Sequence, residues 1–281
     1  MEYKILSNGV KMPILGFGVY QVPDLDECER VVSEAISVGY RLIDTAQAYM
    51  NEEAVGNAVK KSGIPREDFF ITTKIWVSNY GYEKAKASLD ASLEKLQTPY
   101  IDLVLLHQPF GDYYGAYRAL EEYYKAGKLK AIGISNFYPD RVADLAIFSE
   151  ITPMVNQVET HVFNQQIKPR ETMEEYGVQI ESWGPFAEGR NNFFNNKVLV
   201  SIGENYGKSS AQVALRYLIQ RDIVVIPKTV NKDRMEQNYD IFDFQLTDDD
   251  MAEILHLDNE ESQFFSHADP DTVKRISSFK V

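Results

Sequence analysis

The sequence has almost no cysteine and no long hydrophobic run. Cys28 is the only cysteine among the 281 residues, so no disulfide can form within the chain, which is typical of proteins from reducing compartments. The apolar runs stop well short of the ~18 residues that a membrane-spanning helix requires, and the N-terminal residues lack the apolar stretch of a signal peptide. We therefore expect a cytoplasmic protein without membrane contact.

A surplus of basic residues is also absent. The chain has 29 Lys and Arg against 42 Asp and Glu, a net charge of −13, which argues against binding to nucleic acid. The four histidines are scattered, and none is paired at the spacing of a zinc site. We therefore expect a small-molecule ligand and no metal. No long exposed apolar stretch is evident, which favours a monomer.

What the sequence does contain is a regular alternation of short apolar runs and helix-like segments. Apolar spacing of three and four residues predicts helices at Asp26–Val38, Glu83–Leu96 and Ser209–Gln220. The predicted strands are Leu15–Tyr20, Leu42–Ala46, Phe69–Lys74, Asp102–His107, Leu129–Asn136, Met154–Glu159, Val178–Trp183 and Ile223–Lys228. Eight such units predict one α/β domain over residues 1–281, a (β/α)₈ TIM barrel.

The rival fold is an open, doubly wound sheet. It would carry a Gly-x-Gly-x-x-Gly turn after its first strand, and the stretch that begins at Leu15 lacks the third glycine. Three further features refine the barrel. Asn8-Gly9 between short apolar stretches predicts an N-terminal β-hairpin with a type I′ turn, residues Phe186–Val198 form an insertion, and Ser262–Val281 form a short C-terminal loop.

Chemically capable side chains gather where the predicted strands end. Asp44 ends the second strand with Tyr49 five residues on, Lys74 ends the third and His107 the fourth. Barrel active sites lie at these carboxyl ends. A lysine in a barrel mouth needs a counter-charge, which Asp44 can supply. Its ammonium would lower the pKa of Tyr49 toward that of a useful proton donor, and His107 could polarise a carbonyl oxygen.

These four residues match, in order, the Asp–Tyr–Lys–His tetrad of the aldo-keto reductase superfamily, which the chain closely resembles. The surrounding motifs match as well: Gly39-Tyr-Arg-Leu-Ile-Asp-Thr-Ala, Leu105-Leu-His-Gln-Pro, Ile132-Gly-Ile-Ser-Asn-Phe and Ile226-Pro-Lys-Thr-Val. The resemblance runs from the hairpin to about Leu257. Its short loops are most like those of the bacterial diketogluconate and aldehyde reductases.

The resemblance implies an NADPH site. Ser135, Asn136 and Gln157 would hold the nicotinamide amide, and Trp183 would stack on its ring beside Gly184, Pro185 and Phe186. Lys228, Thr229, Val230 and Arg234 would hold the 2′-phosphate end, where a guanidinium fork and a point charge suit a dianion, and Gln237 and Asn238 would lie beside the adenine. Two cations on so acidic a chain favour NADPH over NADH.

The resemblance also places Tyr20, Trp76 and Phe110 at the substrate mouth, with Gln108 beside His107 and with Asn79 and His161 within reach. Because the C-terminal loop is short, we expect an open site for small aldehydes, α-dicarbonyls or keto-sugars. The chain is thus expected to be an NADPH-dependent carbonyl reductase. The alternatives are a catalytically silent NADPH-binding regulatory subunit and an aldolase that forms a Schiff base on Lys74 or Lys228.

Overall fold

The computed structural model describes residues 2–281, in which strands and helices alternate along the chain. The strands are β1 (Tyr3–Ile5), β2 (Lys11–Pro13), β3 (Gly16–Gly18), β4 (Leu42–Asp44), β5 (Phe70–Ile75), β6 (Ile101–Leu106), β7 (Leu129–Ser135), β8 (Val155–Glu159), β9 (Gln179–Trp183) and β10 (Val224–Val225). The α-helices are α1 (Leu25–Val38), α2 (Glu52–Lys61), α3 (Tyr82–Lys95), α4 (Tyr113–Lys125), α5 (Pro139–Phe148), α6 (Ile167–Glu175), α7 (Lys197–Tyr206), α8 (Ser210–Gln220), α9 (Lys232–Tyr239), α10 (Asp248–Leu255) and α11 (Pro270–Ser278). Short 3₁₀ helices are η1 (Gln47–Tyr49), η2 (Arg66–Asp68), η3 (Val77–Asn79) and η4 (Ala187–Asn195).

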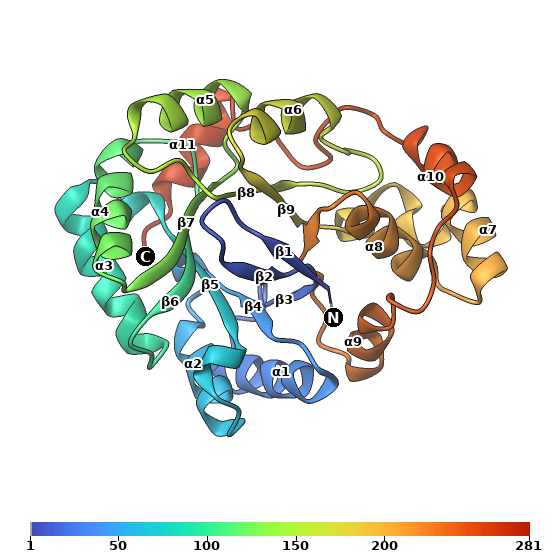
Figure 1. Ribbon diagram of the computed structural model, residues 1–281, viewed down its shortest axis with the longest axis horizontal. Helices are drawn as coiled ribbons and strands as arrows, with labels where there is room; N and C mark the ends of the chain where they lie inside the picture. Colours follow the sequence, from blue (N-terminus) through green and yellow to red (C-terminus); the bar gives the residue numbers. More distant parts are fainter. Residues whose placement is uncertain (1) are drawn as a thin grey trace.

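Strands β3 to β10 form a parallel barrel. Within residues 2–281 these eight strands pair in sequence order, and the helices surround them (Figure 1). The ring closes between its last and first strands, because Val225 N donates to Ile14 O at 2.9 Å and Gly18 N donates to Pro227 O at 3.1 Å. The predicted (β/α)₈ barrel is confirmed.

Strand alternation explains how an ionic side chain comes to lie inside the barrel. Every residue of β5 is buried, as is usual for a parallel strand covered on both faces. Successive side chains point to opposite faces, so Thr73 points outward and donates to Glu52 of α2 at 2.6 Å. Lys74 therefore points into the barrel, as does Thr72 one layer below.

The N-terminal hairpin of β1 and β2 leads directly into β3, so it lies across the amino end of the barrel, where Leu6 and Met12 are buried. Its turn is not of type I′. That turn needs a positive φ at both central residues, but only Gly9 has one (φ 86°) and Asn8 does not. Gly9 N donates to Leu6 O and Leu6 N to Val10 O, which is the three-residue loop with a bulge at the glycine.

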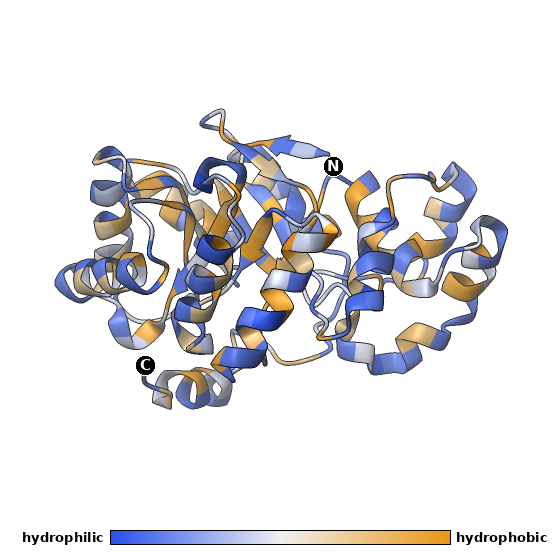
Figure 2. Ribbon diagram, turned by 90° about the horizontal axis from the view of Figure 1, so that it is seen from below, coloured by the Kyte–Doolittle hydropathy of each residue, from blue (hydrophilic) through white to orange (hydrophobic). Residues whose placement is uncertain are grey.

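The expected C-terminal loop contains the helix α11. The insertion predicted at Phe186–Val198 spans η4, whose residues 188–192 have non-helical backbone angles, and the start of α7. Figure 2 shows the N-terminus and the C-terminus at opposite ends of the barrel, so the C-terminal segment lies at the carboxyl ends of the strands. In residues 2–281 no helix combines the length and apolar character needed to cross a membrane.

Candidate active site

A cleft with a volume of about 1000 Å³ opens at the carboxyl ends of the strands, on the side where the sequence placed the site. Asp44, Tyr49 and His107 line it together, although they come from β4, η1 and the end of β6. Lys74 does not line the cleft. It lies directly beneath the cleft, and its side chain has no exposed surface. The four residues therefore converge, with Lys74 enclosed and the other three at the cleft.

The ammonium of Lys74 has a partner for each of its three hydrogens. Nζ donates to Asp44 Oδ1 at 2.6 Å, to the backbone oxygen of Thr45 at 2.9 Å and to the phenol oxygen of Tyr49 at 3.3 Å. Full hydrogen bonding and a paired carboxylate are the conditions under which a charge can be buried at a tolerable cost. The geometry therefore fixes the ammonium against Tyr49.

The proton on Lys74 is firmly held. Burial by itself lowers the pKa of Lys74, but the neighbouring Asp44 carboxylate and Tyr49 outweigh burial, so its pKa lies above the ordinary value. An amine must be deprotonated and accessible to form a Schiff base. The enclosed, protonated Lys74 is therefore unsuited to the aldolase role that the sequence left open for it.

The prediction that the pKa of Tyr49 is lowered is wrong for the protein without ligand. Burial raises the pKa of Tyr49 to about 12, and although Lys74 acts in the opposite direction, it does not overcome burial. Tyr49 thus keeps its proton across the ordinary pH range. What Lys74 stabilises is the phenolate that forms when Tyr49 gives its proton away.

His107 is a neutral imidazole at ordinary pH. Burial, together with the charge of Lys74, holds its pKa well below the usual range. Its ring packs edge-on against Trp76 and Tyr49, with ring centres 5.0 and 5.7 Å apart. Nδ1 is enclosed and has no hydrogen-bond partner in residues 2–281, so Nε2 is the ring nitrogen left for a ligand.

Asn136 ties three strand ends together on the opposite wall of the cleft. Its Nδ2 donates to the backbone oxygen of His107 and to Ser135 Oγ, both at 3.1 Å, and its Oδ1 accepts from Trp183 Nε1 at 2.8 Å. Asn136 adopts a left-handed backbone conformation with φ 66°, which asparagine tolerates better than most residues. From this position the amide holds the backbone of His107 and the indole nitrogen of Trp183.

Gln157 joins this wall to the tetrad. Its Nε2 donates to Asp44 Oδ2 and to Glu181 Oε2, both at 2.9 Å, and its backbone oxygen accepts from Ser135 Oγ at 2.8 Å. Gln157 and Trp183 line the cleft, as do Gly184, Pro185 and Phe186. The sequence did not single out Glu181, since a glutamate in mid-strand gives no sign of its partners.

The predicted phosphate-binding residues extend from one edge of the cleft. Lys228 lines the cleft, while Thr229, Val230, Arg234, Gln237 and Asn238 do not line it and lie in the loop and helix α9 that follow. Asn231 begins α9 by accepting from Arg234 N at 3.1 Å, and the Arg234 side chain is exposed. Lys228 lies beyond β10, which is shorter than predicted.

The C-terminal segment covers part of the mouth. Trp76 Nε1 donates to the backbone oxygen of Phe279 at 2.9 Å, and the Phe264 ring lies 5.2 Å from that of Trp183. Both phenylalanines line the cleft, together with Tyr20 and Gln108. The sequence missed the two phenylalanines, because positions on a terminal segment cannot be assigned to the site without knowing its path. The C-terminal segment therefore forms part of the mouth.

Some predicted mouth residues lie elsewhere. Phe110 is not in the cleft lining but packs against His267, which is, with ring centres 6.1 Å apart. Asn79 donates to Gln47 at 2.9 Å and does not line the cleft. His161 is fully buried and bonded to Glu159 at 2.9 Å.

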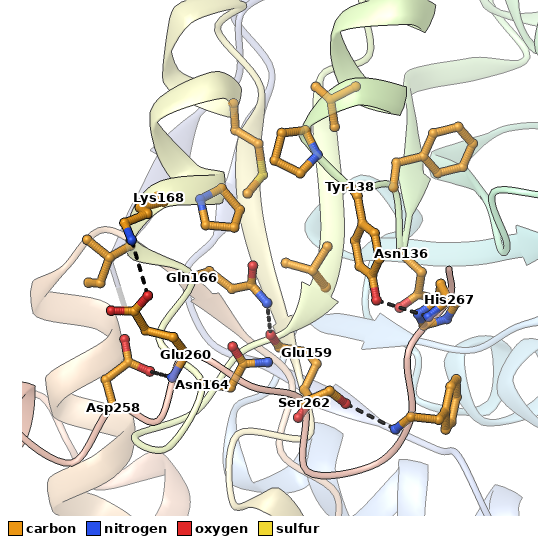
Figure 3. Close-up of a pocket in the computed structure, with 18 residues that line it drawn as sticks. Asn136, Tyr138, Glu159, Asn164, Gln166, Lys168, Asp258, Glu260, Ser262 and His267 are labelled. Atoms are coloured by element: carbon orange, nitrogen blue, oxygen red, sulfur yellow. Dashed lines mark hydrogen bonds and ion pairs between the residues drawn. The ribbon is translucent and has the colours of Figure 1, made fainter. Parts of the chain in front are cut away.

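A second, smaller cavity of about 390 Å³ lies beside the cleft (Figure 3). It is bounded by α5, α6 and the C-terminal segment, and Asn136, Phe265 and His267 border both spaces. At its rim Lys168 pairs with Glu260 at 3.3 Å, and the Tyr138 hydroxyl accepts from His267 N at 2.9 Å. The cavity therefore adjoins the cleft at His267.

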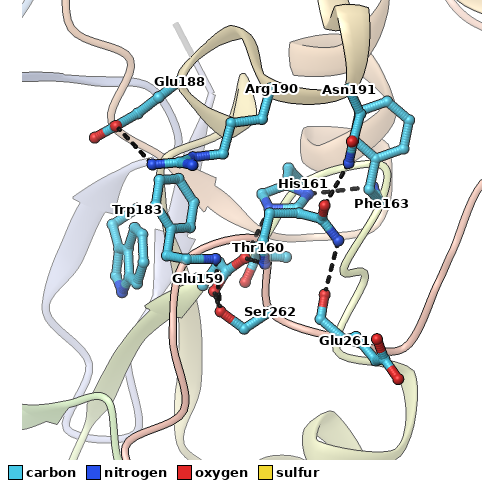
Figure 4. Close-up of polar contacts among 12 residues, drawn as sticks. Glu159, Thr160, His161, Phe163, Trp183, Glu188, Arg190, Asn191, Glu261 and Ser262 are labelled. Carbon is cyan, nitrogen blue, oxygen red and sulfur yellow. Dashed lines mark hydrogen bonds and ion pairs between the residues drawn. The ribbon is translucent and has the colours of Figure 1, made fainter. Parts of the chain in front are cut away.

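Glu159, at the end of β8, fastens the C-terminal segment to the barrel (Figure 4). Its carboxylate accepts from Ser262 Oγ at 2.5 Å and from Gln263 N at 2.8 Å, and it pairs with His161. Arg190 stacks on the Phe264 ring 4.5 Å from its centre, beside Trp183. Among residues 2–281, no three or more His, Cys, Asp or Glu side chains are grouped to hold a metal ion.

Comparison with known proteins connects this geometry to a family. Residues 15–259 match the model of the aldo/keto reductase family. The chain is 46% identical over 257 residues to a glyoxal reductase of Bacillus subtilis, covering 91% of this chain and 92% of that protein. It is 40% identical over 256 residues to the methylglyoxal reductase DkgA of Escherichia coli, covering 90% and 92%.

Solved structures agree. The fold matches that of MGS-M4, an aldo-keto reductase from a deep-sea metagenome library, with a TM-score of 0.92 and 39% identity over 95% of this chain and 98% of that one. It also matches a Bombyx mori aldo-keto reductase in complex with NADP, with a TM-score of 0.89 and 31% identity over 97% and 96%. The chain therefore belongs to the aldo/keto reductase family.

Proposed function

We propose that this protein reduces the carbonyl group of small molecules to an alcohol with NADPH. α-Dicarbonyls such as glyoxal head the substrate class, followed by small aldehydes and keto-sugars. The observation that carries the proposal is the Tyr49 hydroxyl: it lines a cleft, lies 3.3 Å from an enclosed ammonium and packs against a neutral imidazole. The relatives named for glyoxal and methylglyoxal reduction support the choice of substrates.

The cofactor would be held along the wall opposite Tyr49. Ser135, Asn136 and Gln157 would bind the nicotinamide amide, and Trp183 would offer its ring for stacking, flanked by Gly184, Pro185 and Phe186. Gln157 fits this task. Two carboxyl groups take both of its amide hydrogens, so its carbonyl oxygen is the atom left for a ligand. A carbonyl oxygen accepts hydrogen bonds, as the NH₂ group of a carboxamide requires.

The other end of the cofactor would lie along the loop after β10. Lys228 and Arg234 would pair with the 2′-phosphate, helped by the Thr229 hydroxyl and the backbone at Val230. Gln237 and Asn238 would lie beside the adenine. A phosphate dianion suits this pair of cations, one a point charge and one a planar fork.

The carbonyl oxygen of the substrate would bind between Tyr49 Oη and His107 Nε2. When bound, NADPH would supply a hydride to the carbonyl carbon. Tyr49 then donates its proton to the oxygen as negative charge develops there, which in general acid catalysis gives about 10²- to 10⁴-fold in rate. Lys74 stabilises the resulting phenolate, and Asp44 keeps Lys74 charged and in place. His107, which is neutral, donates a hydrogen bond that orients the carbonyl group.

The alternative, a catalytically silent NADPH-binding subunit, would need the cofactor wall but not the proton donor. The contact between Lys74 and Tyr49 has no use in such a protein, whereas a reductase depends on it. Burying an ammonium below the cleft costs stability, and proteins keep such costly groups at functional sites. We therefore favour the enzyme.

A panel of carbonyl compounds tests the proposal. Glyoxal, methylglyoxal, a simple aldehyde and a keto-sugar would each be mixed with the protein and either NADPH or NADH, and oxidation of the cofactor followed by absorbance. We expect turnover of the dicarbonyls with NADPH and weaker turnover with NADH. Tight NADPH binding without oxidation by any compound would instead support the silent subunit.

We also propose that the protein acts as a monomer in the cytoplasm. The single cysteine, Cys28, is a buried free thiol, which suits a reducing compartment. The cleft is formed within one chain and does not need a second copy. Light scattering on the purified protein should give the mass of one chain, and a dimer mass would contradict the proposal.

A further inference from the structure

A second carboxyl group is enclosed in the barrel close to the tetrad. Glu181 lies on β9 two residues before Trp183, so both side chains point to the inside of the barrel. Glu181 has no exposed surface. Its Oε2 accepts from Gln157 Nε2 at 2.9 Å, and its Oε1 has no hydrogen-bond partner within residues 2–281.

Gln157 is the bridge between this carboxyl and Asp44. One amide group donates to both, at 2.9 Å each, so the two acids fix which way the amide faces. With both hydrogens used, its carbonyl oxygen is the remaining polar atom, and Gln157 lines the cleft. Gln157 therefore links Glu181 to the cleft.

The carboxyl groups bonded to Gln157 outnumber the cations beside them. Asp44 from β4 and Glu181 from β9 face a single cation, Lys74 from β5. Strand β10 brings only Val224 and Val225. On β8, Gln157 is neutral and the Glu159 carboxylate is bonded to His161 and the C-terminal segment. His107, at the end of β6, is neutral.

An enclosed site with one uncompensated negative charge is costly, and Asp44 already has the ion pair with Lys74. Burial first, and then the charge of Asp44, raises the pKa of Glu181 to about 8. Burial also raises the pKa of Asp44, but the charge of Lys74 and the hydrogen bonds from Lys74 and Gln157 act in the opposite direction. Glu181 has no ion pair within residues 2–281, so we assign the proton to Glu181 near neutral pH.

We propose that Glu181 is a positioning residue that is neutral in the free protein and gives up its proton when an oxidised, positively charged nicotinamide ring is bound beside Gln157. The affinity of the protein for NADP⁺ relative to NADPH then depends on pH. The inference rests on the proposed cofactor site. A positive ring stabilises the carboxylate and a neutral ring does not, so the proton leaves to solvent only with NADP⁺. Raising the pH then strengthens NADP⁺ binding relative to NADPH.

The test of this proposal is to measure the dissociation constants of NADP⁺ and NADPH by tryptophan fluorescence. The pH would run from about 6 to about 9, a range around the titration of Glu181. The ratio of the two constants removes effects common to both cofactors, such as titration of the 2′-phosphate. Tyr49, with a pKa raised to about 12, and His107, with a pKa well below its usual range, titrate outside this range. In the unmodified protein we expect NADP⁺ binding to strengthen relative to NADPH binding by about 3- to 10-fold across this range. A change of this size corresponds to a shift of up to about one unit in the pKa of Glu181 between the two complexes.

The variant Glu181→Gln removes the titratable carboxyl group but keeps an oxygen that accepts from Gln157. The ratio of its two dissociation constants should therefore not change with pH. The matched control is Glu52→Gln. Glu52 is also a buried carboxyl, bonded to Thr73 on the outer face of β5, and its removal should leave the pH dependence as in the unmodified protein. A pH dependence that persists in Glu181→Gln would overturn the proposal.

A second measurement needs no variant. In weakly buffered solution at neutral pH, an indicator dye reports the protons released when each cofactor binds. We expect NADP⁺ to release a larger fraction of a proton than NADPH. Equal release overturns the inference about Glu181, whereas failure of both cofactors to bind would instead overturn the proposed function.

Discussion

The ammonium nitrogen of Lys74 lies 3.3 Å from the phenol oxygen of Tyr49. Without a ligand this contact does not ionise the phenol, because burial raises the pKa of Tyr49 to about 12. The contact matters when the proton leaves, since the phenolate then forms next to a fixed positive charge. Tyr49 thus keeps its proton until an acceptor binds beside it.

Replacing Lys74 should affect both folding and catalysis. Lys74→Met leaves Asp44 as a buried charge without its partner, for which we expect a loss of about 3–5 kcal/mol in the free energy of unfolding. The double variant Asp44→Asn with Lys74→Met removes both charges and should recover most of that stability but none of the activity. Denaturant unfolding of the two variants measures this. Recovery of activity in the double variant would contradict the role of the ion pair.

Arg234 should select for the phosphorylated cofactor. Arg234→Ala should weaken NADPH binding by about 5- to 10-fold, the value of roughly 1 kcal/mol for an exposed charged contact, and leave NADH binding unchanged. Lys232→Ala is the control, because Lys232 is an exposed cation on the same helix that we place outside the site. Fluorescence titration with each cofactor gives the constants. Equal losses in the two variants would show a general field effect and not a specific contact.

Glu159 should make the anchoring of the C-terminal segment depend on pH. Burial by itself raises the pKa of Glu159, but the bonds from His161, Ser262 and Gln263 outweigh burial, so its pKa is lowered. A carboxyl with a lowered folded-state pKa stabilises above its unfolded value of about 4.3, and this contribution is lost as the pH falls through the folded value. At neutral pH, Glu159→Gln should lose about 1–3 kcal/mol.

Thermal unfolding at a series of pH values measures this effect. The difference between the unmodified protein and Glu159→Gln should be largest at neutral pH and should shrink below about pH 4. Limited proteolysis should at the same time cut the segment after Asp258 faster in the variant. A stability difference that stays constant with pH would mean that the charge of Glu159 does not anchor the segment.

Phe279 should affect substrate binding more than cofactor binding. Its ring packs edge-on against Trp76 at 5.7 Å, a contact worth about 0.5–1.5 kcal/mol. Phe279→Ala keeps the backbone oxygen that accepts from Trp76 but opens the mouth, so KM for methylglyoxal should rise about 2- to 10-fold with the NADPH constant unchanged. Phe148→Ala removes a more exposed ring on α5 and serves as the control. A KM unchanged by Phe279→Ala would place the ring outside the substrate path.

The sequence predicted the barrel and the tetrad because both depend on local signals. Apolar runs fix where strands lie, and a polar residue at the end of such a run must lie at the barrel mouth. Asp44 and His107 were found in this way. Lys74 is one residue short of the end of β5, a difference that puts it beneath the cleft floor.

Features that depend on distant contacts could not be predicted. The sign of the Tyr49 pKa shift depends on how deeply the ring is buried, and the partners of Glu181 come from strands that are remote in the sequence. The positions of Phe264 and Phe279 depend on the path of the terminal segment over the mouth. The hairpin turn differs because two turn types accept the pair Asn8-Gly9, and the backbone angle at Asn8 decides between them.

If the Tyr49 hydroxyl is the proton donor, Tyr49→Phe should lose catalysis and keep cofactor binding. The variant removes one oxygen and keeps the ring that packs on His107 and Tyr20. We expect the single-turnover rate of NADPH oxidation by methylglyoxal to fall by about 10²- to 10⁴-fold, with the NADPH dissociation constant nearly unchanged. A variant that binds NADPH normally and keeps most of its rate would show that Tyr49 is not the proton donor.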